Sequence, residues 1–191
     1  MKKTLIFLAL TVCAFLSSCG DDAWDYDHSL EHVYYYGLCN EAYPGGNEKV
    51  YTVAQGGTVE VPTQFWSSFT RSYSPTVYYY TSPVPDTDDE DGVDEPQLVC
   101  GTDYVVVDAN GNTLTPDANG AYPMTWPNAV AGIQNVYIKA LNGQTGSIRV
   151  LTFDPTKTMN NMDVESTVIV RTNEYEVRAF TENYYVTVNI E

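Results

Sequence analysis

The chain has 191 residues, of which 25 are acidic and only nine are Lys or Arg, so its formal net charge is −16 at pH 7. A chain this acidic repels phosphate backbones and anionic headgroups, and no basic patch interrupts the charge, which excludes a nucleic-acid-binding function. The hydrophobic fraction of 43% is ample for a core, and the abundance of Tyr, Val and Thr beside few Leu and Lys favours strands over helices.

The first 18 residues have the organisation of an export signal. Two lysines follow the initial Met, and then comes an apolar run from Leu5 to Leu16 that is too short to span a bilayer as a stable helix. Two small serines separate this run from Cys19. We therefore expect residues 1–18 to be removed as a signal peptide, which leaves 173 residues, a size that suits one domain.

The stretch Leu16-Ser17-Ser18-Cys19 resembles the lipobox of bacterial lipoproteins, in which the Cys thiol takes a diacylglycerol and the chain is cut just before it. The resemblance implies that Cys19 is lipidated and that two or three acyl chains anchor the protein, where a single chain would bind a membrane only marginally. The alternative is an ordinary secretory signal with a Cys nearby.

The residues after the lipobox, Gly20-Asp21-Asp22, resemble the short acidic export signal of Bacteroidota surface lipoproteins. This resemblance implies an outer-membrane location, lipid-anchored at the cell surface, with the periplasmic face as the alternative. Residues 19–31 then form the lipidated Cys and a flexible polar tether.

Two cysteines, Cys39 and Cys100, remain once Cys13 leaves with the signal and Cys19 is acylated. An extracytoplasmic location permits a disulfide between them, which on the chain-entropy model stabilises the fold by about 3–4 kcal/mol. Two unpaired buried cysteines are the alternative. No second pair of cysteines stands at metal-ligand spacing.

Residues 32–191 read as a single domain of short strands separated by Gly, Pro and Asn turns, and no helical period of comparable strength is present. The expected strands are 32–38, 49–53, 58–65, 76–81, 100–107, 122–126, 135–141, 147–153, 166–171, 175–180 and 183–190. We expect a hairpin around Gln55-Gly56-Gly57 and a sheet edge at 122–126. The pattern predicts an all-β fold, an antiparallel immunoglobulin-like β-sandwich.

The stretch Gly101-Thr102-Asp103-Tyr104, followed by a strand, a turn and the strand at 134–141, resembles the G-x-D-Y region of Calx-beta-like and related immunoglobulin-like modules. The C-terminal sequence YEVRAFTENYYVTVNI is similar to the final strands of small Bacteroidota surface lipoproteins, which are often associated with polysaccharide-uptake systems. Calcium-binding Calx-beta modules carry a terminal acidic cluster, which Glu191 alone does not replace.

Seven acidic residues gather at 86–95. If Gly92 occupied position 6 of an EF-hand loop, Thr87 would stand at position 1 and Leu98 at position 12, so the template fails at both ends. The interpretation is a solvated loop, and a calcium site of another kind is the alternative.

The two histidines, His28 and His32, stand four residues apart beside acids, but no helical pattern would bring both rings to one face, so no metal or cofactor is expected. With no third His in the sequence, a Ser-His-Asp or Cys-His site is hard to build. Acids are so abundant that some carboxylate pair always qualifies for glycoside hydrolysis, and none is singled out. No catalytic residue is assigned, and the chain is not expected to be an enzyme.

Aromatic side chains are the remaining candidates for function. Alternate strand residues point to opposite faces, so in the two Tyr triplets Tyr35 and Tyr79, which share faces with Val33 and Val77, are expected in the core. The solvent-facing ligand-binding candidates, together with two tryptophans expected in loops, are Tyr34, Tyr36, Tyr78, Tyr80, Trp66 and Trp126. Exposed rings stack on sugars, and the alternative is that Tyr simply suits a half-exposed strand.

The sequence thus predicts a cell-surface lipoprotein that acts as a non-catalytic binding module, with a glycan as ligand in a polysaccharide-uptake system. The alternative is a structural or adhesive envelope subunit that engages a protein partner through a sheet edge.

Overall fold

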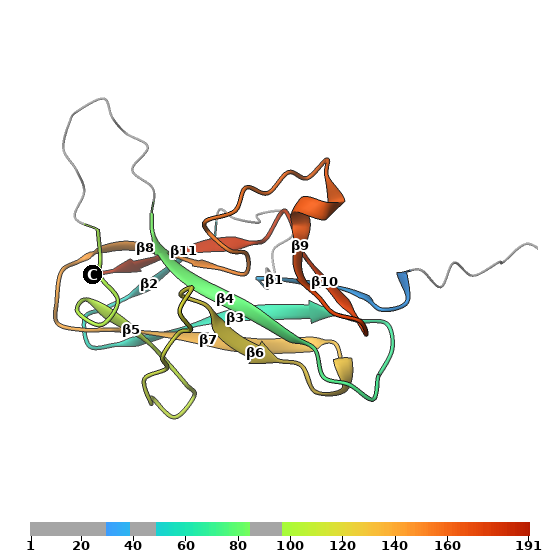
Figure 1. The fold of residues 1–191 in the computed structure, drawn as a ribbon. Helices are drawn as coiled ribbons and strands as arrows, with labels where there is room; N and C mark the ends of the chain where they lie inside the picture. The colour runs from blue at the N-terminus through green and yellow to red at the C-terminus, as the bar shows by residue number, and fades with distance from the viewer. Residues whose placement is uncertain (1–29, 39–48, 85–96) are drawn as a thin grey trace, which may run out of the picture. The chain divides into compact units, whose positions relative to one another are not determined.

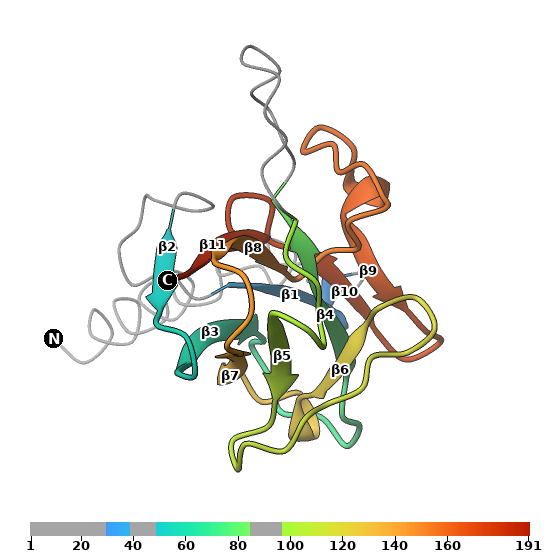
Figure 2. The same cartoon turned by 90° about the vertical axis from the view of Figure 1, so that its left-hand side faces the viewer.

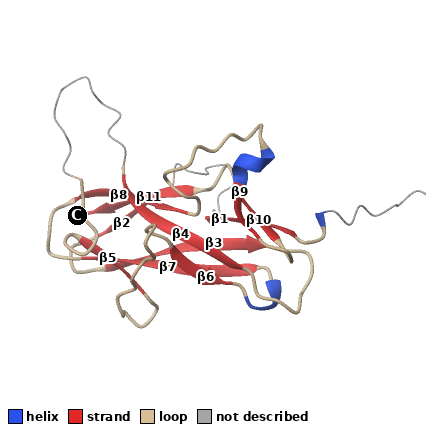
Figure 3. Cartoon of the chain, in the orientation of Figure 1, coloured by secondary structure: helices blue, strands red, loops and turns tan. Residues whose placement is uncertain are grey.

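Two β-sheets face each other across one core (Figures 1 and 3). The computed structural model describes residues 30–38, 49–84 and 97–191, and within them His32–Glu191 belongs to one compact unit. The strands are β1 (Val33–Leu38), β2 (Val50–Val53), β3 (Thr58–Trp66), β4 (Thr76–Pro83), β5 (Tyr104–Val107), β6 (Tyr122–Thr125), β7 (Gly132–Ala140), β8 (Gly146–Leu151), β9 (Val168–Arg171), β10 (Glu176–Ala179) and β11 (Tyr185–Ile190). Short 3-10 turns lie at Pro127–Ala129 and Val164–Thr167.

The six-stranded sheet has the order β5-β7-β3-β1-β10-β9, and the five-stranded sheet has the order β2-β11-β8-β4-β6. The predicted all-β sandwich is confirmed, as is the edge position of β6, and β9 and β10 pair with each other in antiparallel fashion. The pairing is mostly antiparallel, but β1 pairs with β10 and β2 with β11 in parallel. Both parallel pairs join strands far apart in sequence, as parallel pairing requires, because no tight turn can connect such strands.

The predicted hairpin of β2 with β3 is wrong. β2 pairs with β11 in one sheet, while β3 pairs with β1 and β7 in the other. The turn between them donates hydrogen bonds away from any hairpin ladder, from the Gln55 N–H to the Glu191 carbonyl (2.7 Å) and from the Gly56 N–H to the Ala140 carbonyl (3.2 Å). This turn therefore passes the chain from one sheet to the other, a step that local turn residues alone do not reveal (Figure 2).

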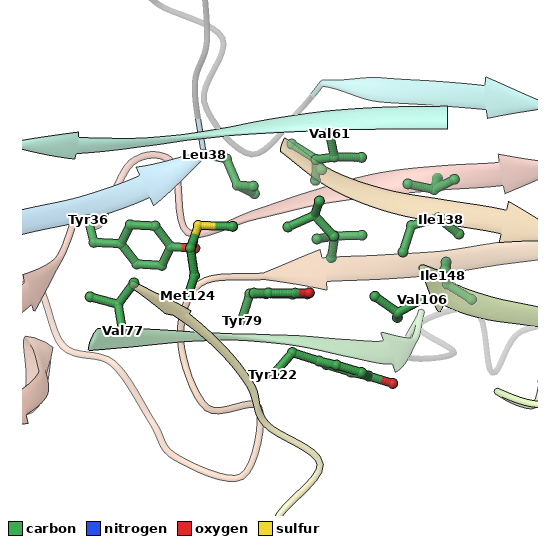
Figure 4. Packing of buried hydrophobic residues seen from close by; sticks show 14 of the residues in the cluster. Tyr36, Leu38, Val61, Val77, Tyr79, Val106, Tyr122, Met124, Ile138 and Ile148 are labelled. Carbon is green, nitrogen blue, oxygen red and sulfur yellow. The ribbon is translucent and has the colours of Figure 1, made fainter. Parts of the chain in front are cut away.

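The core lies between the sheets and takes one face of nearly every strand (Figure 4). Along β3, Val61 and Phe65 are fully buried, and on the neighbouring strand β7 Val136 lies opposite Val61 and Ile138 opposite Val59. This alternation is the period of two that a half-buried strand requires. Within the described residues, no helix is long and apolar enough to cross a membrane.

Candidate functional site

The expectation that Tyr34 and Tyr36 face solvent is wrong. Tyr34 is 2% and Tyr36 0% exposed, whereas Tyr35 is 41% exposed on the outer face of the six-stranded sheet. The even-numbered residues of β1 include Leu38 as well as the two rings, so this set buries more apolar surface than Val33 and Tyr35 could. Neither buried ring offers a face to a ligand.

In the second Tyr triplet, Tyr79 lies in the core as expected. It is 4% exposed and stacks on Tyr122. Tyr78 and Tyr80 point to the other face, but Tyr80 is only 8% exposed because it packs with Leu151 and Ala121 in a second, smaller apolar cluster. That burial raises the pKa of Tyr80 to about 12. β1 and β4 belong to opposite sheets, so the two triplets do not form one aromatic patch.

The two candidate tryptophans lie in different environments, one in the core and one on the outer face of a sheet. Trp126 was expected in an exposed loop, but it is 3% exposed and stacks on Phe65 in the core, with 5.2 Å between ring centroids. Trp66 ends β3 on the outer face, where it is partly exposed and stacks on Phe180 at 5.0 Å. Its cross-strand neighbour is Tyr35, so the structure brings together two partly exposed rings that the sequence analysis had separated.

Cys100 is exposed and forms no disulfide with another described residue, and its Sγ lies 3.8 Å from the Tyr122 hydroxyl. Its predicted partner Cys39 lies outside the described residues, as does Cys19, so the disulfide and the lipidation stay predictions.

A pocket of about 360 Å³ adjoins Cys100 and is lined in part by Tyr104 and Tyr122. The hydroxyl of Tyr104 is engaged within the protein, since it donates to Thr81 Oγ1 at 3.0 Å. Burial raises the pKa of Tyr104 to about 12.

In the described part of the chain, no group of three or more His, Cys, Asp or Glu side chains is placed to hold a metal ion. The Nδ1 atom of His32 pairs with the hydroxyl of Tyr73 at 2.5 Å. His28 and the acidic run at 86–95 lie outside the described residues.

Two connections lie side by side where the chain crosses between the sheets. Residues 152–167 lead from β8 to β9, and residues 180–184 lead from β10 to β11 (Figure 1). The Thr152 N–H donates to the Tyr184 carbonyl at 2.8 Å, and the rings of Phe153 and Tyr184 meet edge to face. These contacts fix one connection against the other.

Three adjoining pockets follow these connections, with volumes of about 210, 560 and 150 Å³. The first and second share Asn161 and Thr181, and the second and third share Met159 and Tyr184. We name these three adjoining pockets together the crossover groove. Its lining residues include Tyr35, Arg149, Asp154, Lys157, Thr158, Met159, Asn160, Asn161, Arg178, Phe180, Thr181 and Tyr184.

The longer connection is held in shape by hydrogen bonds within itself. The Asp154 carboxylate accepts from the Thr156 N–H (2.9 Å) and hydroxyl (2.7 Å), an Asx turn. Further along, the Ser166 hydroxyl accepts from the Asn160 N–H at 2.9 Å and donates to the Asn160 carbonyl at 2.8 Å. One wall of the groove is therefore a structured loop on a rigid sandwich, the usual setting of a binding site.

The carboxylates around the groove are held ionised. Burial raises the pKa of Glu176, but hydrogen bonds from Arg178 (2.5 Å) and Arg171 (2.6 Å) outweigh it and hold that pKa below its usual range. A hydrogen bond from Arg171 likewise lowers the pKa of Glu165. Burial also raises the pKa of Asp154, and the bonds from Thr156 outweigh it.

The groove is made mainly of residues that sequence reasoning missed. Asn160 and Asn161 were part of a polar connection to which no role was given. Thr181 lay between two expected strands, and Tyr184 was expected in the last strand, 183–190, with no role in a site. The sequence offered a partial signal in the length of this connection. The expected strands leave residues 154–165 between them, and the structure extends the connection to residues 152–167, longer than most connections in a domain. Long ordered loops tend to be functional.

Comparison with known proteins adds little to this geometry. No family model matches the sequence, and no curated protein matches it. Among solved structures, the chain is similar to the solution structure of CaCohA2 from Clostridium acetobutylicum, with 17% identity, coverage of 83% of this chain and 92% of that chain, and a TM-score of 0.33. It is also similar to a chain in a crystal structure of a CaDoc0917–CaCohA2 complex at pH 5.5, with 14% identity, coverage of 83% and 99%, and a TM-score of 0.33. Likeness at this level carries no inference about function, and the sandwich is established by its own strand pairing.

Proposed function

We propose that this protein is a lipid-anchored envelope protein whose sandwich domain binds a glycan in the crossover groove without catalysis. The observation that carries the proposal is the composition of the groove, because uncharged Asn and Thr side chains line its first two pockets together with the rings of Tyr35 and Tyr184. Sugars present hydroxyls beside apolar ring faces, and this lining offers a counterpart to both.

The side chain of Asn161 is the central polar group of the site. It lies where the first two pockets meet, and no hydrogen bond engages it among the described residues. An amide supplies two donors and one acceptor, which matches a pair of neighbouring sugar hydroxyls. Thr181 contributes a hydroxyl to the same two pockets from the opposite connection.

The state of the carboxylates supports binding over hydrolysis. Glycoside hydrolysis requires one carboxylic acid with a raised pKa as proton donor. The pKa values of Asp154, Glu165 and Glu176 are all lowered instead, so these groups are ionised at neutral pH and none of them serves as that acid.

The proposed location rests on the lipobox resemblance around Cys19 and on the acidic residues that follow it. An anchored module at the cell surface would capture a polymer outside the cell and hold it near an uptake system. This role needs a site that a polymer can reach, and a groove lined by two structured surface connections fits that need.

The test is a glycan array probed with the full-length chain purified in detergent, followed by variants of the groove. For each glycan that the wild type retains, we expect Tyr35→Ala and Asn161→Ala each to lower the affinity at least about tenfold. Tyr35→Ala removes a stacking ring, and Asn161→Ala removes a hydrogen-bonding amide. Phe69→Ala and Asn173→Ala, exposed residues outside the groove, are the matched controls and should bind as the wild type does. Failure of the wild type to retain any glycan, or equal losses in the controls, would contradict the proposal.

A protein partner is the second candidate, and the outer face of the six-stranded sheet favours it. Ile133 is 57% and Tyr35 41% exposed there, on strands that flank Gln64 and Trp66 of β3. Two of the four edge strands are poorly suited to the strand addition that the alternative prediction assumed. Thr113 already bridges to Val107 of the edge strand β5, and edge strand β6 contains a proline.

A photo-crosslinker at position 133, introduced in cells that carry the full-length protein, tests this second candidate. A discrete cross-linked band that is lost with Tyr35→Glu supports a face-on partner. β9 is the other edge strand of the six-stranded sheet. If cross-links form only from a probe placed in β9, the result would instead support strand addition.

A further inference from the structure

The third pocket of the crossover groove contains two cations, Arg149 and Lys157, in a chain that has few. Arg149 rises from the outer face of β8, between Ser82 of β4 and Thr187 of β11. Its guanidinium carbon lies 4.4 Å from the ring centroid of Tyr185, a cation–π contact that holds the side chain in place. The pocket therefore has a preorganised guanidinium in its wall.

Arg149 differs from Arg171 and Arg178 in what its side chain contacts. Arg171 and Arg178 both donate to the Glu176 carboxylate, at 2.6 and 2.5 Å. Among the described residues the side chain of Arg149 has no hydrogen bond or ion pair, and its Nε is buried without a partner. Because acids outnumber bases 25 to nine in this sequence, an arginine without a carboxylate partner stands out.

The one carboxylate in the pocket does not balance the two cations. Asp154 accepts two hydrogen bonds from Thr156, and Lys157 Nζ lies 3.9 Å from its Oδ2. The Lys157 side chain is 60% exposed, so its charge remains available at the mouth of the pocket. The pocket thus has a local excess of positive charge.

We propose that this pocket binds an anionic group of the glycan, a carboxylate of a uronic acid or a sulfate ester, through Arg149 with help from Lys157. This inference rests on the proposed glycan-binding function and names the class of sugar. Both anions accept paired N–H donors from a planar guanidinium, and such charge-assisted bonds are among the stronger ones. The net negative charge of the chain does not prevent this, because exposed charges beyond about 8 Å are largely screened at physiological salt.

The experiment measures the affinity of the full-length protein for four polymers at 0.15 M salt. Hyaluronan carries carboxylates only, carrageenan carries sulfates only, chondroitin sulfate carries both, and dextran is neutral. We expect an anionic polymer to be preferred over dextran and its affinity to fall about tenfold or more with Arg149→Gln. Lys157→Gln should cost less because that side chain is more exposed, and Lys139→Gln, on the outer face of the other sheet, should cost nothing.

Arg149→Lys keeps the charge without the paired donors and reports on folding. It should retain the melting temperature of the wild type while binding the anionic polymer more weakly. Hyaluronan and carrageenan distinguish the two anions. If neutral glycans bind as well as anionic ones and Arg149→Gln changes neither, the anion inference is wrong while the groove proposal remains. If neither Arg149→Gln nor Asn161→Ala affects a glycan that the wild type retains, both are wrong.

Discussion

The carboxylate of Asp103 accepts a hydrogen bond from the backbone N–H of Gln144 at 2.9 Å, joining the loop before β5 to the turn after β7. Its other oxygen accepts a hydrogen bond from the Val99 N–H at 2.7 Å, and Asp103 is only 1% exposed. A buried carboxylate in this position ties two loops together by their backbones. The Gly-Thr-Asp-Tyr stretch noted in the sequence therefore has a structural role that needs no calcium.

Asp103 makes folding pH-dependent in a defined direction. The two backbone N–H donors, from Gln144 first and Val99 second, lower the pKa of its carboxyl in the folded state. The stability it contributes is therefore fully present above the pKa of an Asp in the unfolded chain, about 3.9, and is lost as the pH falls through the lower folded pKa. We expect Asp103→Asn to melt below the wild type at pH 7, with a gap that narrows at pH 3. An equal gap at both pH values, or an effect matched by the exposed Glu182→Gln, would contradict this role.

Because Gly143 has no side chain, Asp103 can pack directly against it. A Cβ atom at this position would lie 3.0 Å from the Asp103 Cα and still closer to its Oδ1. We expect Gly143→Ala to destabilise the fold by about 1–3 kcal/mol in urea unfolding, because the turn must shift to accept the methyl group. Gly132→Ala is the control, since its Cβ would meet only Trp126 at an ordinary 3.8 Å. Similar midpoints for the two variants would show that the contact is unimportant.

The orientation of β1 is tested by two neighbouring tyrosines. Tyr36→Ala removes a fully buried ring and should cost about 3–5 kcal/mol, whereas Tyr35→Ala removes a ring that is 41% exposed and should cost less than about 1 kcal/mol. Thermal or urea unfolding of both variants measures the difference. A larger loss from Tyr35→Ala would mean that β1 presents its other face to the core.

The orientation of β1 also shows where the sequence stops being informative. Strand positions, the two-sheet architecture and the burial of Tyr79 follow from local alternation and turn residues. In β1 both faces carry tyrosines, and the choice depends on Leu38 and on Phe180, which covers Gly37 so closely that a Cβ there would lie 2.9 Å from the Phe180 Cβ. That contact comes from a turn more than 140 residues away, which no local pattern specifies.

The crossover groove could not be predicted for the same reason. Asn161 and Thr181 are ordinary loop residues in the sequence, and they share two pockets only because the connections after β8 and β10 cross between the sheets at one place. The parallel pairing of β1 with β10 helps to set that arrangement, and parallel partners leave no hairpin signal.

Anchoring is tested at Cys19. Cys19→Ala removes the thiol that would take the diacylglycerol, so we expect the variant to lose fatty-acid labelling and to leave the membrane fraction or remain unprocessed. Cys100→Ala is the matched control and should label as the wild type does. A Cys19→Ala protein that still labels and still sediments with membranes would overturn the lipobox interpretation.

Hydrogen exchange on the full-length protein, with and without a glycan that it retains, tests the central claim most directly. Because the glycan is proposed to lie between the two crossover connections, backbone amides at 158–167 and 180–184 should gain protection, and amides at 99–103 on the Cys100 side should not change. Asn161→Ala should abolish the gain at the same glycan concentration. Protection confined to 99–103, or to the outer faces of β5 and β7, would place the ligand elsewhere and contradict the crossover groove as its binding site.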